Sequence, residues 1–242
     1  MAESAVEATD FSAMVEMLWG PLKPRTRGPK PTHALEDVLD AAIGLADREG
    51  LAALSMQRLA QELGFTKMAL YRYVPGRPEL IAAMTDRALG PPPAANARTG
   101  WRKGLEAWAL AAFDMFLAHP WGLEATTGPR VIGPNEAAWT EAGLRLFAKT
   151  SLGGADRLDV LAVTIGHMRA MAQQAAGIGS GAARNGMHEE LLTAGLKGHE
   201  TEFPEFARAV AETAASNGAD NGLSFGLNCI FDGIEVRLRR GR

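Results

Sequence analysis

The chain has 242 residues, of which 47% are hydrophobic, and a formal net charge of -3. This length allows one large domain or a small module plus a larger one, with a sizeable core. No stretch approaches the roughly 18 to 20 uninterrupted apolar residues of a membrane span, which excludes an integral membrane protein of helical type. A single cysteine, Cys229, and a start without basic and apolar leader regions favour a soluble protein of the reducing cytoplasm.

Charge and apolar residues are unevenly distributed near the start of the chain. Residues 1–20 carry four acids and no base, whereas residues 21–90 carry ten bases against eight acids. The bases flank acids concentrated in residues 36–49, so a locally positive face is possible. The acidic start also contains "FSAMVEMLWG", whose apolar residues recur at helical spacing. It is either an extra helix that docks on the body or a flexible segment; the apolar positions are Phe11, Met14, Val15 and Leu18.

A basic segment follows, "RTRGPKPT" at 25–32, whose prolines and glycine disfavour helix. We expect an extended arm carrying Arg25, Arg27 and Lys30. It either lies along a DNA minor groove, as arms of other helical DNA-binding domains do, or is a soluble tail.

The remaining pattern predicts an all-α protein, because apolar residues recur three and four positions apart and alternating strand patterns are nearly absent. Thr32 is a candidate cap for a helix through Glu49, Ser55 for a helix over 56–63 and Thr66 for one over 67–74. Pro78 begins a fourth helix. The sequence "GPPPAANA" at 90–97 marks a boundary, and further helices are expected at 100–118, 135–150, 155–176, 186–197, 204–216 and 220–239.

Three regions result from this division of the chain. An N-terminal extension with the basic arm occupies 1–30, a compact helical module 31–90, and a larger helical domain 98–242.

The segment "SMQRLAQELGFTKMALYRYV" has the features of two helices joined by a tight turn. Ala60 allows close helix approach and Gly64 can adopt the left-handed turn conformation. The inward positions that would close a small core are Leu59, Leu63, Phe65, Leu70 and Val74. The positions left pointing outward are Lys67, Met68, Ala69, Tyr71 and Arg72.

The chemistry of these outward side chains matches the groups in the major groove of DNA. Lysine and arginine hydrogen-bond guanine edges, methionine and alanine contact thymine methyl groups, and tyrosine hydroxyls reach phosphates. The pattern therefore favours a helix-turn-helix that reads DNA. The alternative is an ordinary helical hairpin with solvated bases and half-buried tyrosines.

The predicted helix-turn-helix and the residues around it resemble a known family. The segment "LSMQRLAQELGFTKMALYRYVPGRPELI", preceded by "AAIGLADREG", is similar to the N-terminal domain of the TetR family of bacterial transcriptional repressors. The resemblance implies a homodimer that binds a palindromic DNA operator and leaves it when a small molecule enters the C-terminal domain. The implied contacts are Thr66, Lys67, Met68, Ala69 and Arg72 with bases, Tyr71 and Tyr73 with phosphate and sugar, Gln57 with the groove, and Arg77 with phosphate. Tyr73 replaces the histidine common in the family, so that packing and phosphate binding are both open for it.

The C-terminal part resembles the ligand-binding domain of the tetracycline-repressor branch through "HPW", "GPR", "GPN" and "TIGHMRAMAQQ". A stripe of mixed polarity at 155–176 could supply the few polar groups that a mostly apolar pocket needs. Candidate effector contacts are Phe113, Phe116, Arg130, Thr164, His167, Met171 and Gln174. His167 is alternatively a satisfied core or interface histidine, Phe113 and Phe116 are alternatively core, and Arg130 is alternatively a surface arginine.

Tetracycline repressors bind a drug that carries magnesium, through a histidine and acidic groups. Here no acid lies between Val160 and Ala176, and "ATTGPR" contains no histidine. We therefore expect a metal-free organic effector, with no resident cofactor and no metal site.

The last predicted helix, "GLSFGLNCIFDGIEVRLRR", has one apolar stripe: Leu223, Leu227, Ile230, Ile234 and Leu238. Such a stripe can form half of a helical dimer interface, or it can pack within its own subunit.

Two other functions are alternatives to a DNA-binding regulator. The five histidines form no tight metal-spaced pair, and "GIGSG" lacks the context of a nucleophile elbow or a dinucleotide site, so we expect no enzyme. A helical docking or architectural module without operator binding is the second alternative.

Overall fold

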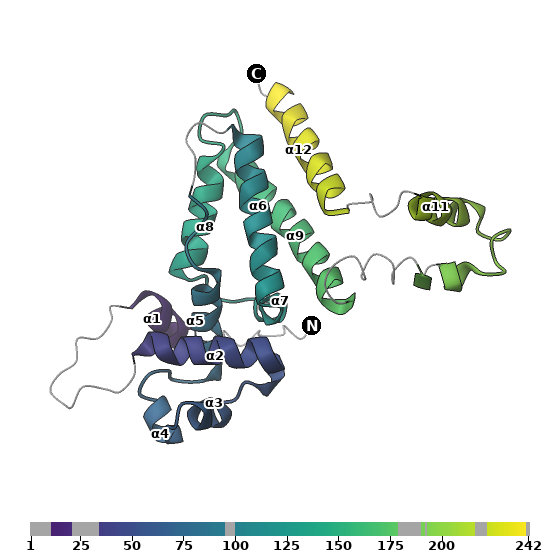
Figure 1. Ribbon diagram of the computed structural model, residues 1–242. Coiled ribbons are helices and arrows are strands. Elements are labelled where there is room, and N and C mark those ends of the chain that lie inside the picture. Colours follow the sequence, from purple (N-terminus) through teal and green to yellow (C-terminus); the bar gives the residue numbers. More distant parts are fainter. Residues whose placement is uncertain are drawn as a thin grey trace, which may run out of the picture. The chain divides into compact units, whose positions relative to one another are not determined.

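The computed structural model describes residues 11–20, 34–94, 100–178, 190–191, 193–215 and 222–240 (Figure 1). All regular elements in these ranges are helical, which confirms the predicted all-α class. None of the helices described there is both long and apolar enough to cross a membrane.

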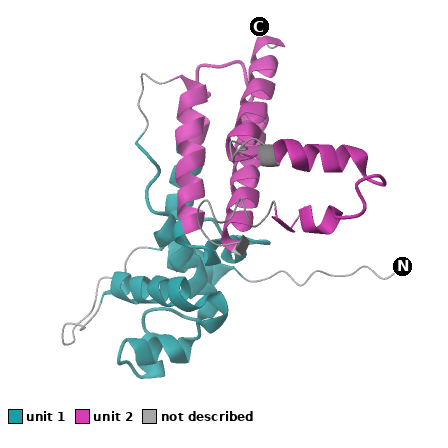
Figure 2. Cartoon of the chain, turned by 45° about the vertical axis from the view of Figure 1, so that its right-hand side comes forward, with its two compact units in different colours: residues 1–94, 118–142 teal, residues 95–117, 143–242 magenta. Residues whose placement is uncertain are grey.

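The chain divides into two compact units (Figure 2). The first comprises residues 1–94 and 118–142, and the second comprises 95–117 and 143–242. Helices of the first unit are α1 (Ser12–Trp19), α2 (Leu35–Glu49), the 3-10 turn η1 (Leu51–Ala53), α3 (Met56–Glu62), α4 (Lys67–Leu70), α5 (Arg77–Leu89), α7 (Trp121–Ala125) and most of α8 (Pro134–Arg145). Helices of the second are nearly all of α6 (Trp101–Ala118), with α9 (Gly154–Ile178), α11 (Pro204–Ala215) and α12 (Gly222–Arg240).

Local capping explains where α2 and α3 begin. Ser55 caps α3 by accepting a hydrogen bond from the Arg58 amide at 3.1 Å. Helix α2 begins at Leu35, where the Ala34 amide donates to the Asp37 carboxylate at 2.7 Å. The cap expected from Thr32 lies outside the described residues.

The core of the first unit is formed by the apolar faces of α2, α3, α4 and α5. Val38, Leu45, Leu59, Leu70 and Leu80 have no exposed surface. Helix α1 packs on this body and contributes Met17 and Leu18 to the margin of the core. Of the two alternatives for the N-terminal segment, the structure therefore has the docked helix.

Helix α7 was not among the predicted helices, and it fixes residues 118–142 to the first unit. Trp121 is 5% exposed within the core of that unit, and its indole N–H donates to the Asp47 carboxylate at 2.6 Å. Trp139 donates to the main-chain oxygen of Gly90 at 3.0 Å. The expected 98–242 domain is continuous in sequence. In the structure, residues 118–142 belong instead to the first unit, which they contact in this way.

The second unit packs α12 on α9, and the start of α6 contacts α12 through aromatic rings. The Trp101 ring meets Phe147 at 5.7 Å and Phe231 edge-on at 6.3 Å between centroids. At the edge of this cluster the Arg102 guanidinium donates to Asp232 at 2.7 Å and to Asn228 at 3.2 Å. Apolar burial with a bordering ion pair therefore links the start of α6 to α12.

Two of the described helices end several residues earlier than predicted. The expected 67–74 helix is α-helical only to Leu70 and continues as turns, and Pro75 disfavours the α conformation at the residue before it. The expected 135–150 helix ends at Arg145, and hydrogen bonds of the tighter i→i+3 kind follow, such as Ala148 N to Arg145 O at 3.1 Å.

Candidate DNA-binding interface

The turn between α3 and α4 has the geometry that the sequence predicted. Gly64 has φ of +66°, in the left-handed region that favours glycine. The Phe65 amide donates to the Ala60 oxygen at 2.7 Å, and the Thr66 hydroxyl accepts from the Ala69 amide at 3.2 Å. The turn therefore fixes the direction in which α4 leaves α3.

Buried residues hold α3 and α4 together on the side that faces the core. Leu59, Leu70 and Val74 are fully buried and Ala60 is 2% exposed, which leaves room at position 60 only for a small side chain. Two ion pairs join α3 to α2, one between Arg58 and Glu49 and one between Arg48 and Glu62. These contacts make α4 a supported helix rather than a free turn.

The opposite side of α4 faces solvent. Met68 is 75% exposed, so its side chain is accessible to a DNA groove. Lys67 and Arg72 are exposed, and the Lys67 amine lies 5.9 Å from the centre of the Tyr71 ring. Exposed residues on or next to this side also include Gln57 and Thr66, while Ala69 is half-buried.

Tyr73 is positioned differently from Tyr71. Its ring is half-buried and stacks on Phe65 with centroids 5.6 Å apart and planes 14° apart. Packing, one of its two predicted roles, is thus present. Phosphate binding by its hydroxyl stays a prediction.

Arg77 has structural partners that sequence analysis missed. Its Nε donates to the Leu54 oxygen at 2.8 Å and its Nη2 to the Leu51 oxygen at 3.0 Å, which ties the start of α5 to η1. These two bonds use two of the five N–H donors of its guanidinium, and its predicted phosphate contact stays a prediction. The other predicted basic contacts, Arg25, Arg27 and Lys30, lie outside the described residues.

Comparison with known proteins agrees with this geometry. Residues 38–84 match the family described as "Bacterial regulatory proteins, tetR family", and residues 92–238 match "Tetracyclin repressor-like, C-terminal domain". The chain belongs to the TetR family. It is a TetR-family transcription regulator with a helix-turn-helix DNA-binding domain and a ligand-binding domain.

Individual relatives support the same family. The chain is 34% identical to the HTH-type transcriptional repressor DrrR1 of Streptomyces coeruleorubidus, over 96% of this chain and 88% of that protein. It is 28% identical to an HTH-type transcriptional regulator of Saccharopolyspora erythraea, over 55% of this chain and 56% of the relative. The structure of the Streptomyces coelicolor TetR family protein ActR in complex with actinorhodin is similar with a TM-score of 0.74 at 25% identity, covering 86% of this chain and 97% of that one.

In this TetR-family regulator the candidate effector residues fall into both units. Phe116 and Thr164 are buried in the second unit, where the Arg169 guanidinium lies 5.3 Å from the Phe116 ring centre. The Thr164 hydroxyl donates to the Val160 oxygen at 2.7 Å. Arg130 belongs to the first unit and pairs with Glu136. Phe113 and Met171 are half-buried and Gln174 is exposed.

His167 contacts the start of α12. Its Nε2 lies 3.0 Å from the main-chain oxygen of Leu223, and the ring lies against Gly226, so closely that a Cβ at position 226 would overlap it. This is the contact of a packed histidine, which was the alternative to effector binding. Effector binding by His167 stays a prediction.

The apolar stripe of α12 is partly buried within the subunit. Leu227 and Ile234 are each 4% exposed within the single subunit, and Leu223, Ile230 and Leu238 are half-buried. The first two therefore have little surface left for a second subunit, in line with the intrasubunit alternative. Large apolar side chains that remain exposed on α9 and α12 are Leu158, Val163, Phe225 and Val236.

Proposed function

We propose that this TetR-family regulator is a ligand-responsive repressor that binds a palindromic operator as a homodimer and is released by a small organic effector. The observation that carries the proposal is the exposed side of α4, with Lys67, Met68 and Arg72 outward over a fully buried Leu70. A supported helix with this chemistry matches a major groove. Repression is supported by the name of the relative DrrR1.

Binding as a dimer follows from the symmetry of such operators, since paired recognition helices must lie about 34–36 Å apart. The exposed apolar side chains of α9 and α12 support a contact there: Val163 is 58% and Phe225 is 71% exposed. Surfaces of this kind on two packed helices suit a four-helix contact between subunits. Val163→Glu and Phe225→Glu should each turn a dimer into a monomer in light scattering, whereas Leu110→Glu, on α6, should not.

The effector is proposed to be an organic molecule bound in the second unit near Phe116 and Thr164. The supporting observation is that α6 and α9 bring the Phe116 ring and the Arg169 guanidinium together there, and pockets for drug-sized ligands combine aromatic side chains with a few polar groups. Because ActR is described in complex with actinorhodin, actinorhodin is a suitable first probe. It should lower the affinity of the purified protein for its DNA.

The decisive experiment is selection of bound fragments from genomic DNA, followed by affinity measurement at fixed salt. The triple substitution of Lys67, Tyr71 and Arg72 by alanine should abolish binding to the selected palindrome. Substitution of Lys103 by alanine, a lysine of the second unit, should leave it unchanged. Equal affinity of the triple variant and the unchanged protein would remove α4 as the recognition helix and favour the docking module.

A further inference from the structure

Helix α1 lies outside the ranges that match the family, 38–84 and 92–238, yet it makes specific contacts. It packs on α5, and the Trp19 indole N–H donates to the main-chain oxygen of Ile132 at 2.9 Å. The side chain of Trp19 thereby reaches the segment that leads into α8. One short helix thus connects elements far apart in the sequence.

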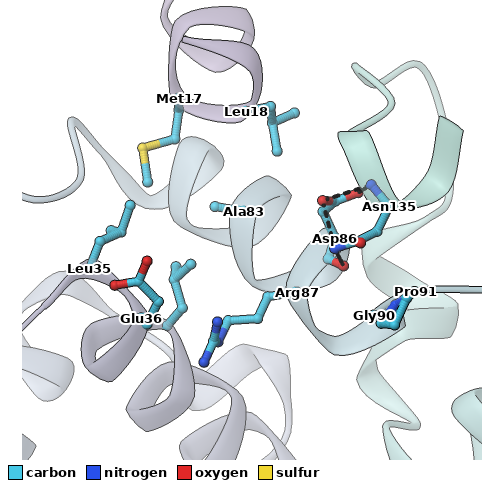
Figure 3. Close-up of a pocket in the computed structure, with 11 residues that line it drawn as sticks. Met17, Leu18, Leu35, Glu36, Ala83, Asp86, Arg87, Gly90, Pro91 and Asn135 are labelled. Carbon is cyan, nitrogen blue, oxygen red and sulfur yellow. Dashed lines mark hydrogen bonds between the residues drawn. The ribbon is translucent and has the colours of Figure 1, made fainter. Parts of the chain in front are cut away.

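The segment held by Trp19 is joined to α5 by a second set of bonds. The Asn135 main-chain amide donates to the Asp86 carboxylate at 3.0 Å, and its side-chain amide donates to the Asp86 main-chain oxygen at 3.0 Å (Figure 3). The Glu136 amide also donates to the Asp86 carboxylate, at 3.1 Å. A carboxylate at this place satisfies orphan amides and interacts favourably with the helix dipole. Asp86 of α5 is therefore the cap of α8.

Helix α1 also lines one side of the cleft above this joint. Met17 and Leu18 face Ala83 of α5 across a cleft of about 320 Å³, with Asp86 and Asn135 at one end (Figure 3). Movement of α8 away from α5 would open this cleft further and break the bond to Trp19. The contacts of α1 thus stabilise one arrangement of the joint.

The α5–α8 joint involves both of the ranges that match the family domains. Residues of α5 up to position 84 match the DNA-binding family domain, and α8 lies within the range that matches the C-terminal domain. Two sites are coupled when ligands at each bias the same structural element. The α5–α8 joint lies within the first unit and links these two matched ranges.

We propose that Trp19 is a positioning residue that holds the N-terminal end of α8 on Asp86 and so strengthens the coupling between effector and operator. The effect on operator affinity rests on the proposed function, whereas the contact between Trp19 and Ile132 does not depend on it. A looser joint lets the two matched domains move more independently. The effector then changes operator affinity by a smaller factor.

The test uses the full chain with Trp19→Phe, which removes the indole N–H and keeps an aromatic ring. Trp19 is 50% exposed, so this change leaves no sealed cavity. Trp19→Ala is the stronger variant. Val15→Ala is the control, because Val15 lies on the same helix and is 45% exposed. Circular dichroism checks that each variant is folded.

The first readout is hydrogen exchange of the Asn135 and Glu136 amides, which needs neither operator nor effector. Loss of one hydrogen bond should speed exchange about twofold to tenfold in Trp19→Phe, and no change is expected in Val15→Ala. Unchanged exchange in both Trp19 variants would overturn the proposal.

The second readout is the ratio of affinities for a selected genomic fragment with and without actinorhodin. This ratio should fall about twofold to tenfold in Trp19→Phe and stay constant in Val15→Ala. Faster exchange with an unchanged ratio would overturn the coupling role. If actinorhodin releases no DNA from the unchanged protein, the proposed effector function fails, while the exchange result still decides whether Trp19 holds the joint.

Discussion

The Arg77 guanidinium donates to the main-chain oxygen of Leu54 at 2.8 Å, and its second bond to Leu51 completes a link between α5 and η1. Hydrogen bonds from a charged donor contribute about 1.5–3 kcal/mol. Arg77→Met should lower the free energy of unfolding by about that amount in urea denaturation.

Arg72→Met is the matched control for Arg77. Arg72 is exposed and lies beside the predicted base contacts, so its loss should reduce operator affinity and leave stability within about 0.5 kcal/mol. If both variants are equally stable, the guanidinium of Arg77 contributes little to the fold.

Gly226 on α12 should tolerate no side chain. A Cβ there would overlap the His167 ring, whose Nε2 is bonded to the Leu223 oxygen. Gly226→Ala should lower the free energy of unfolding by about 1–3 kcal/mol, since overpacking displaces the ring. Gly233, seven residues later on the same helix, has no neighbouring atom within 4 Å of the position that a Cβ would take. Gly233→Ala should be neutral or more stable by up to about 1 kcal/mol in the same denaturation.

Gly133 allows the α5–α8 joint to close. A Cβ at this position would overlap the Asp86 carboxylate. Gly133→Ala should therefore displace the cap of α8 and cost about 0.5–2 kcal/mol. Gly153 also directly precedes a helix, α9, but has open space around its Cβ position. Thermal unfolding of Gly133→Ala and Gly153→Ala, measured side by side, compares the two; similar midpoints would contradict the steric explanation.

Asp40 and Arg87 join α2 to α5 through two bonds, at 2.5 Å and 2.7 Å. The hydrogen bond from Arg87 holds the pKa of the Asp40 carboxyl below its ordinary value. Because the folded-state pKa is lower than the unfolded one, the stabilisation is present above the unfolded pKa and is lost as pH falls through the folded pKa.

The Arg87 and Asp40 side chains are 35% and 58% exposed, so solvent screens the pair and its contribution is roughly 0.2–1 kcal/mol. The difference in unfolding free energy between the unchanged protein and Asp40→Asn should be present at neutral pH. It should shrink from about pH 5 to about pH 3. A difference that stays constant over this range would show that the charge of Asp40 is not its source.

The sequence by itself determined the features that depend on near neighbours in the chain. Ala60, Gly64 and Thr66 predict the helix-turn-helix because a tight turn needs a small contact residue, a left-handed glycine and a cap within a few positions. The positions of α6, α9 and α12 follow in the same way from apolar periodicity.

Only the tertiary structure decided what each surface contacts. An apolar stripe predicts that one side of α12 is buried, but periodicity is the same whether Leu227 packs on its own subunit or on another. The bond that the Asn135 amide donates to Asp86 spans 49 positions, and the motif "GPN" that contains Asn135 does not indicate its partner. Trp121, likewise, joins the first unit through Asp47, 74 positions earlier. The packing of whole helices brings such distant residues into contact, so the sequence alone does not identify them as partners.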